Sequence, residues 1–147
     1  MIGLALGLGA VSLRAATTER VVADPHTGLA LYGFDPVTYF TGGEPEVGRA
    51  EVEYRFAGVI WRFRNEGNRA AFAADPDVYM PRFGGYDPVG IARGVATPGH
   101  PQLWVRRENR VYLFHKPETR AQFAADPQGS LDVAEGRWPA VMNGLVQ

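Results

Sequence analysis

The sequence predicts an α+β fold built from two pseudo-symmetric units, each a β-hairpin followed by a short helix, with a further helix at the C-terminus. Two internal matches carry this prediction. A shift of 51 residues aligns WRFRNEGNRAAFAADP, ending at Pro76, with YLFHKPETRAQFAADP, ending at Pro127, and eight of the sixteen positions are identical. A shift of 52 aligns GFDPV, from Gly33, with GYDPV, from Gly85. Matches in the same order at nearly the same offset indicate an internal duplication.

Length and composition are those of one compact domain. We divide the 147 residues into an N-terminal segment, 1–22, a first unit, 23–80, and a second unit with the C-terminal helix, 81–147. The net charge of −1 gives no positive field for nucleic acid. The absence of cysteine excludes disulfides, thiolate metal sites and cysteine nucleophiles.

The chain begins with an apolar run, IGLALGLGAVSL, of twelve residues. Such a run is too short for a bilayer core of about 30 Å, but it suits the apolar region of a secretory signal. We therefore expect a signal or N-terminal segment over 1–22, a periplasmic or secreted protein, and no transmembrane segment. Because no Lys or Arg precedes the run, a cytoplasmic protein is the alternative. The fold is expected to begin after about Val22.

Each unit opens with a Gly-aromatic-Asp-Pro-Val turn, followed by a predicted hairpin. In the first unit EVEYRF and VIWRF flank Ala57-Gly58, and in the second LWVRR and RVYLF flank Glu108-Asn109. Alternating β-branched and aromatic residues around a two-residue turn are typical of a β-hairpin.

A short helix is predicted after each hairpin. Asn65 is placed to cap the first helix, and Pro117 takes the first helical position of the second. Both helices carry Arg-Ala-x-Phe-Ala-Ala and are expected to stop at Asp-Pro. Phe72 and Phe123 are the predicted core anchors. The repeated FAADP therefore indicates structure: a helix body, an aromatic anchor and a stop.

The tail SLDVAEGRWPAVMNGLV is predicted to be helical. Leu131, Ala134 and Trp138 lie about one turn apart on one face. We expect Trp138 to be buried against the sheets and Pro139 to break or kink the helix.

Four phrases of the sequence carry a resemblance to a known family. They are YGFDPVTYFTGGEP, the block F-x-N-E-G-N-R-A-A-F-A-A-D-P-D-V-Y from Phe63, PRFGGYDP and RWPAV, and together they cover Leu29 to Val141. The chain resembles the YHS-domain family in its longer, exported bacterial form, most members of which have no established activity. The resemblance implies that the two units are YHS-like.

The resemblance also implies where metal ligands would lie. The YHS-like pattern places cysteines after Asp-Pro-Val and at both ends of the turn leading into the helix, where thiolates suit a transition metal. None of these positions holds a cysteine here. They are Thr38, Arg64 and Asn68 in the first unit, Gly90, His115 and Thr119 in the second, and Asp87, where the longer relatives often have cysteine.

His115 is the candidate metal ligand, because it stands at one of these positions. A mixed site for copper or zinc would combine it with Asp87 or with other imidazole, Met and carboxylate groups. The alternative is a histidine that bonds a backbone carbonyl. The other groups available are His26, His100, Met80, Met142, Asp35 and Glu118.

Asp35 and Asp87 are repeated, each before a proline. Two carboxylates about 5–10 Å apart can perform acid–base chemistry, whereas the alternative is an Asx-turn that binds backbone N–H groups. Tyr79, Tyr86 and Trp104, with the glycines of PRFGGYDP, are candidates to line a cleft between the units. The alternative for PRFGGYDP is a linker. No phosphate-loop, dinucleotide, HExxH or Gly-x-Ser-x-Gly pattern is present.

These observations predict a non-enzymatic binding protein that has lost the thiolate metal ligands of its family. A small molecule or partner protein would bind between the units, and the candidate residues are Tyr79, Tyr86, Trp104, Asp35 and Asp87. The alternative is a transition-metal protein that binds copper or zinc through His115 with carboxylate or Met ligands. An enzyme using the aspartate pair is a third hypothesis, and no catalytic residue is assigned.

Overall fold

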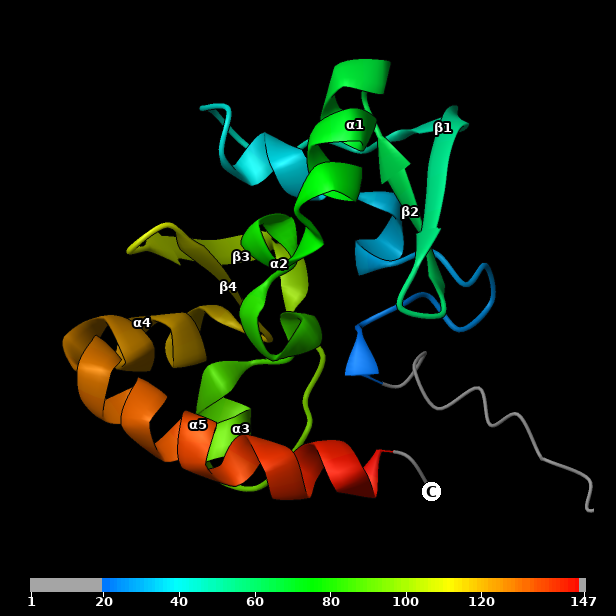
Figure 1. The fold of residues 1–147 in the computed structure, drawn as a ribbon. Helices are drawn as coiled ribbons and strands as arrows, with labels where there is room; N and C mark the ends of the chain where they lie inside the picture. The colour runs from blue at the N-terminus through cyan, green and yellow to red at the C-terminus, as the bar shows by residue number, and fades with distance from the viewer. Residues whose placement is uncertain (1–19, 146–147) are drawn as a thin grey trace, which may run out of the picture.

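The computed structural model describes residues 20–145 and confirms the α+β class (Figure 1). Two antiparallel two-stranded sheets form the two predicted hairpins. The first joins β1 (Arg49–Phe56) to β2 (Val59–Phe63), and the second joins β3 (His100–Arg107) to β4 (Arg110–Phe114). In Figure 1 the first hairpin and α1 occupy the upper part of the view, and α3, α4 and α5 occupy the lower part.

Five helices and three 3-10 turns complete the described part of the chain. No helix within residues 20–145 is both long enough and apolar enough to cross a membrane. The helices are α1 (Glu66–Ala74), α2 (Pro76–Tyr79), α3 (Pro88–Ala92), α4 (Pro117–Ala125) and α5 (Pro127–Gly144), and the 3-10 turns are η2 (Leu31–Gly33), η3 (Pro36–Tyr39) and η4 (Arg82–Gly85).

The residues around the expected start of the fold belong to the folded part of the chain. Val21 and Val22 are buried, and the Val22 N–H donates to Gly84 O at 2.8 Å. The folded part therefore includes at least these two residues of the 1–22 segment. The predicted signal lies outside the described residues over 1–19 and stays a prediction.

The two hairpins share turn and register. Ala57 and Gly58 have φ values of 54° and 77°, and Glu108 and Asn109 have values of 50° and 58°. Two successive left-handed residues are the geometry of the tight turn that matches strand twist. Both hairpins also carry a register shift near the start of their first strand. The duplication seen in the sequence is therefore repeated in backbone detail.

The helix starts follow their predicted caps. The Asn65 side chain accepts a hydrogen bond from Asn68 N at 2.8 Å, and Pro117 is the first residue of α4. Phe72 and Phe123 are fully buried, as predicted for core anchors. The ring centroid of Phe72 lies 4.8 Å from that of Trp61.

The Asp-Pro steps end one helix and begin another, which the sequence analysis did not anticipate. Asp75 ends α1, and Pro76 opens α2; Asp126 ends α4, and Pro127 opens α5. The Asp126 carboxylate accepts from Gly129 N at 3.1 Å. A proline that cannot continue a helix is well suited to the first helical position, and an aspartate before it can cap the new helix.

Of the break or kink expected at Pro139, the break was wrong. α5 runs from Pro127 to Gly144 and includes Pro139. Pro139 and Glu135 are both exposed, so water can reach the carbonyl that the missing proline N–H leaves free.

The inner face of α5 follows the prediction in part. Leu131 and Ala134 are buried, but Trp138 is half-buried. Trp138 packs on Phe83 and Tyr86, with ring centroids 5.7 and 6.3 Å away. These contacts place η4 and the turn after it beside α5.

The two units are joined through β4, which is buried on both faces. Val111 and Leu113 pack in the core of the first unit, whereas Tyr112 and Phe114 pack in the core of the second. In β2, by contrast, alternate residues are buried and half-buried. The second hairpin thus serves both cores, and this arrangement positions the clefts described below.

Candidate functional site

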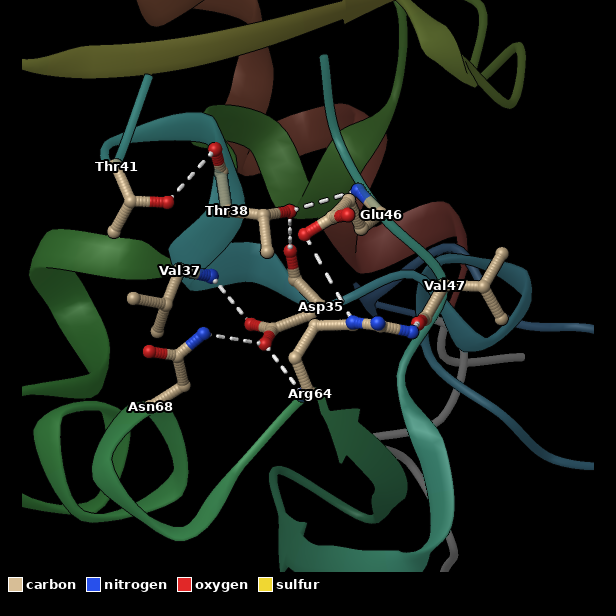
Figure 2. Close-up of polar contacts among 8 residues, drawn as sticks. All are labelled: Asp35, Val37, Thr38, Thr41, Glu46, Val47, Arg64 and Asn68. Carbon is tan, nitrogen blue, oxygen red and sulfur yellow. Dashed lines mark hydrogen bonds and ion pairs between the residues drawn. The ribbon is translucent and has the colours of Figure 1, made fainter. Parts of the chain in front are cut away.

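Asp35 is fully buried and holds the start of α1 (Figure 2). Its Oδ1 accepts a hydrogen bond from Val37 N at 2.8 Å. Its Oδ2 accepts from Arg64 N and from Asn68 Nδ2, each at 2.8 Å. The first bond is the Asx-turn that the sequence analysis gave as the alternative. Both carboxylate oxygens are therefore engaged by the first unit itself.

A wider network ties the loop after η3 to the same place (Figure 2). The Thr38 hydroxyl donates to Asp35 O at 2.7 Å and accepts from Glu46 N at 3.0 Å. The Arg64 guanidinium donates to Val47 O at 3.2 Å and lies 3.8 Å from the Glu46 carboxylate. Side chains and backbone of three segments thus meet around one aspartate.

Asp87 repeats this arrangement in the second unit. Its Oδ1 accepts from Val89 N at 2.8 Å, and its Oδ2 accepts from His115 N at 2.9 Å and from the Thr119 hydroxyl at 2.5 Å. Asp87 is 1% exposed, and Asp35 is 0% exposed. Each carboxylate accepts hydrogen bonds from donors of its own unit and is closed to solvent, which is the geometry of a carboxylate that stabilises the fold.

The first unit does not fit a transition metal at the positions where the YHS-like pattern places cysteines. Thr38, Arg64 and Asn68 converge on Asp35, and they contribute N–H and O–H donors. Donors satisfy a carboxylate and do not ligate a cation, and the Arg64 charge repels one. A hydrogen-bond network therefore occupies these positions.

His115 in the second unit bonds a backbone carbonyl, as its alternative interpretation expected. Its Nδ1 lies 3.1 Å from Pro98 O. Because a carbonyl only accepts, Nδ1 carries a proton, and in the neutral ring Nε2 then keeps its lone pair. Arg64 makes the matching contact to Val47 O in the first unit.

His100 lies beside His115 on a pocket of about 300 Å³. The His100 Nδ1 accepts from Gln102 N at 3.0 Å, so the neutral ring carries its proton on Nε2. Asp87 and the methionines do not line this pocket, and no group of three or more His, Asp or Glu side chains suited to a metal exists within residues 20–145. The lining residues are Tyr32, Pro98, Gly99, His100 and His115.

Tyr32 is a functional candidate that the sequence analysis missed. It lies in the left-handed region, with φ 53°, and is 43% exposed. The second unit has Gly84 at this position, where an added Cβ would meet Arg20 O at 1.8 Å. A bulky residue in this conformation costs about 1–3 kcal/mol, and such strain is common at binding sites. The signal available in the sequence was the alignment of Tyr32 with a glycine.

A second cleft, of about 480 Å³, lies between the two units. Trp104, one of the predicted site residues, lines it, and its ring meets that of Tyr39 edge-on with centroids 5.4 Å apart. The Tyr39 hydroxyl is buried and donates to Pro101 O at 2.6 Å, and burial raises the pKa of Tyr39 above its usual range. The cleft is lined by Tyr39, Gly42 and Gly43 from the first unit and by Trp104, Val105 and Arg106 from the second.

The other predicted site residues lie elsewhere. Tyr79 packs on Phe40, with ring centroids 5.3 Å apart, and Tyr86 packs on Trp138. Of the three predicted aromatic residues, only Trp104 lines this cleft. Tyr39 and Arg106 were not anticipated, and the only signal for Tyr39 was the position of the TYFTGG phrase before an irregular loop.

A larger groove of about 580 Å³ runs along the C-terminal half of α5. Small residues at four-residue spacing, Gly136, Ala140 and Gly144, form one wall, and Gly94 to Ala96 lie on the other. Arg137 is its single charged side chain, so the groove has few groups that would select a ligand.

No protein-family model, curated protein or solved structure matches this chain. The candidate sites therefore rest on the residues and contacts described above.

Proposed function

We propose that this chain is a non-enzymatic binding protein that takes a small molecule in the cleft between its two units. The observation that carries this proposal is a cleft of about 480 Å³ whose walls come from both units and include Trp104. Small-molecule sites are concave and about 300–1,000 Å³ in volume, with aromatic walls and few polar groups. A partner protein is the alternative occupant.

Binding is favoured over catalysis by the state of the two aspartates. Each carboxylate is buried and accepts three hydrogen bonds from its own unit. An acid–base pair needs a proton-transfer path to a substrate, and these carboxylates have no free oxygen facing a cleft.

The test is a thermal-shift screen of small organic ligands against the full chain. Ligands that raise the melting temperature of the wild type should lose most of this effect in Trp104→Ala. They should keep it in Tyr32→Ala, which removes a partly exposed aromatic ring from the other pocket. Ligands that stabilise Trp104→Ala as well as the wild type would contradict the placement.

A transition metal at His115 is the second candidate, and the contact of the His115 ring with Pro98 O favours it. The rings of His100 and His115 line one pocket, and the Nδ1–H of His115 bonds a carbonyl, as the distal nitrogen of a metal-bound histidine commonly does. We expect copper or zinc to be retained after desalting in the wild type and in His26→Ala, and to be lost in His115→Ala. Elemental mass spectrometry measures the content, and retention in His115→Ala would reject the site.

The proposal also covers the family of the protein and its cellular location. The motifs from Leu29 to Val141 support a divergent YHS-domain protein, and the apolar run near the N-terminus supports export to the periplasm or medium. A fusion of residues 1–22 to a phosphatase that is active only outside the cytoplasm tests export. An inactive fusion would favour a cytoplasmic protein.

A further inference from the structure

Arg106 presents an unpaired edge of its guanidinium group at the cleft between the units. Its Nη1 donates to Tyr39 O and Phe40 O, each at 3.4 Å, and its Cζ lies 5.8 Å from the centre of the Phe40 ring. Its Nε and Nη2 have no partner among residues 20–145, and no carboxylate there pairs with it. Nε–H and Nη2–H point the same way and form the fork that binds a carboxylate through two hydrogen bonds.

The other polar side chains of the cleft are also donors. The Tyr39 hydroxyl is already engaged, but the Trp104 indole N–H makes no hydrogen bond to the described residues. The buried Trp61, by comparison, donates its N–H to Phe56 O at 3.0 Å. A cleft whose side chains only donate selects a ligand that accepts.

The Gly42–Gly43 backbone adds two further donors on the opposite wall. These residues have φ values of 88° and 82°, and an added Cβ on either would have no atom within 4 Å. Their N–H groups bond to none of the described residues. Successive free N–H groups in a loop with left-handed residues favour anions.

The charge and the aromatic wall of the cleft indicate the chemical class of the ligand. Arg106 is the single charged side chain among the described residues that line it, which suits one negative charge. The Trp104 ring provides an apolar surface beside this charge, against which a flat ring can pack. We propose that the cleft binds a small aromatic monocarboxylate, with the carboxylate on Arg106 and the ring against Trp104. This assignment rests on the proposed binding function.

The test uses the full chain labelled with 5-fluorotryptophan, whose three tryptophans give three fluorine resonances. The resonances are assigned with single Trp→Phe variants. The probes are 1-naphthoate, the neutral 1-naphthamide and 1-naphthyl phosphate. We expect 1-naphthoate to shift the Trp104 resonance and to bind at least tenfold more tightly than the amide, because a charge-assisted hydrogen bond contributes about 1.5–3 kcal/mol and 1.4 kcal/mol is tenfold.

The matched pair of variants is Arg106→Gln and Arg55→Gln. Arg55 lies 51 residues earlier, at the same place in the first hairpin, and is likewise exposed. Affinity for 1-naphthoate should fall at least tenfold in Arg106→Gln and stay unchanged in Arg55→Gln. The unshifted Trp61 and Trp138 resonances show that each variant is folded.

The other possible results with the three probes would each contradict one feature of the proposed site. Equal affinity for naphthoate and naphthamide at Trp104 would reject carboxylate recognition by Arg106 but would still support ligand binding in the cleft. Tighter binding of the phosphate would reject a monoanion site. An unmoved Trp104 resonance with all three probes would reject the aromatic acid, and the thermal-shift screen then decides independently whether the cleft binds anything.

Discussion

Removing the Asp35 carboxylate should destabilise the fold by a large and calculable amount. Asp35→Ala leaves three donors without their acceptor, of which Val37 N–H is buried and those of Arg64 and Asn68 are partly buried. An unsatisfied buried donor costs about 1–3 kcal/mol, and water can relieve the partly buried ones. We therefore expect the free energy of unfolding to fall by about 3–5 kcal/mol.

Asp35→Asn should cost less, for a reason specific to this site. The asparagine carbonyl can keep the bond to Val37 N, and Asn68 can rotate its amide to present an oxygen to the new NH₂ group. Only the Arg64 N–H then faces another donor, so we expect a loss of about 1–3 kcal/mol.

Urea unfolding followed by circular dichroism measures both losses. Asp77→Asn is the control, because Asp77 is exposed and its side chain makes no hydrogen bond within residues 20–145; we expect a change below about 0.5 kcal/mol. A fall of less than about 1 kcal/mol in the free energy of unfolding of Asp35→Ala would refute the structural role of this carboxylate. Full stability in Asp35→Asn together with loss of an activity would favour the acid–base hypothesis instead.

Three further predictions concern backbone and burial. Gly99→Ala should lower the free energy of unfolding by about 1–3 kcal/mol, because its Cβ would lie 2.6 Å from a backbone oxygen. Gly136→Ala, in open space on a helix, should raise the free energy of unfolding by about 0.5–1 kcal/mol. Urea titration that gives both changes the same sign would contradict this prediction. The double change Glu108→Asn and Asn109→Gly suits the left-handed turn and should raise stability by about 1 kcal/mol, and an unchanged melting temperature would argue against it. Burial raises the pKa of Tyr39, so above about pH 10 the folded state keeps a phenolic proton that the unfolded state loses. The free energy of unfolding is therefore unaffected by this group below about pH 10 and falls by about 1.4 kcal/mol per pH unit above it. Alkaline unfolding of Tyr39→Phe should show a slope smaller by about one proton, and an equal slope would refute the assignment.

The parts of the fold that depend on local signals were predictable from the sequence. The hairpin turns at Ala57 and Glu108 and the cap at Asn65 follow from neighbouring residues. The repeated Asp-Pro-Val turn suggested an Asx-turn, and the structure contains two. The duplication strengthened each of these predictions, because a feature inferred in one unit was checked in the other.

The candidate site depended on contacts that no local pattern encodes. Tyr39 reaches Pro101 and Trp104 across more than sixty residues, so its place in a cleft follows from the way the second hairpin packs on the first unit. Tyr79 and Tyr86 were grouped with Trp104 because aromatic residues were the visible signal, but their rings fill gaps beside Phe40 and Trp138. A break at Pro139 was expected from the usual effect of proline on a helix, but α5 continues through this exposed residue.

The burial of β4 on both faces limits how far the duplicated chain can be taken apart. The first unit alone would lose Val111 and Leu113 from its core, and the second unit would then expose those same side chains to water. Each half carries a complete copy of the sequence pattern but an incomplete interior. The two halves are therefore expected to gain and lose their structure together.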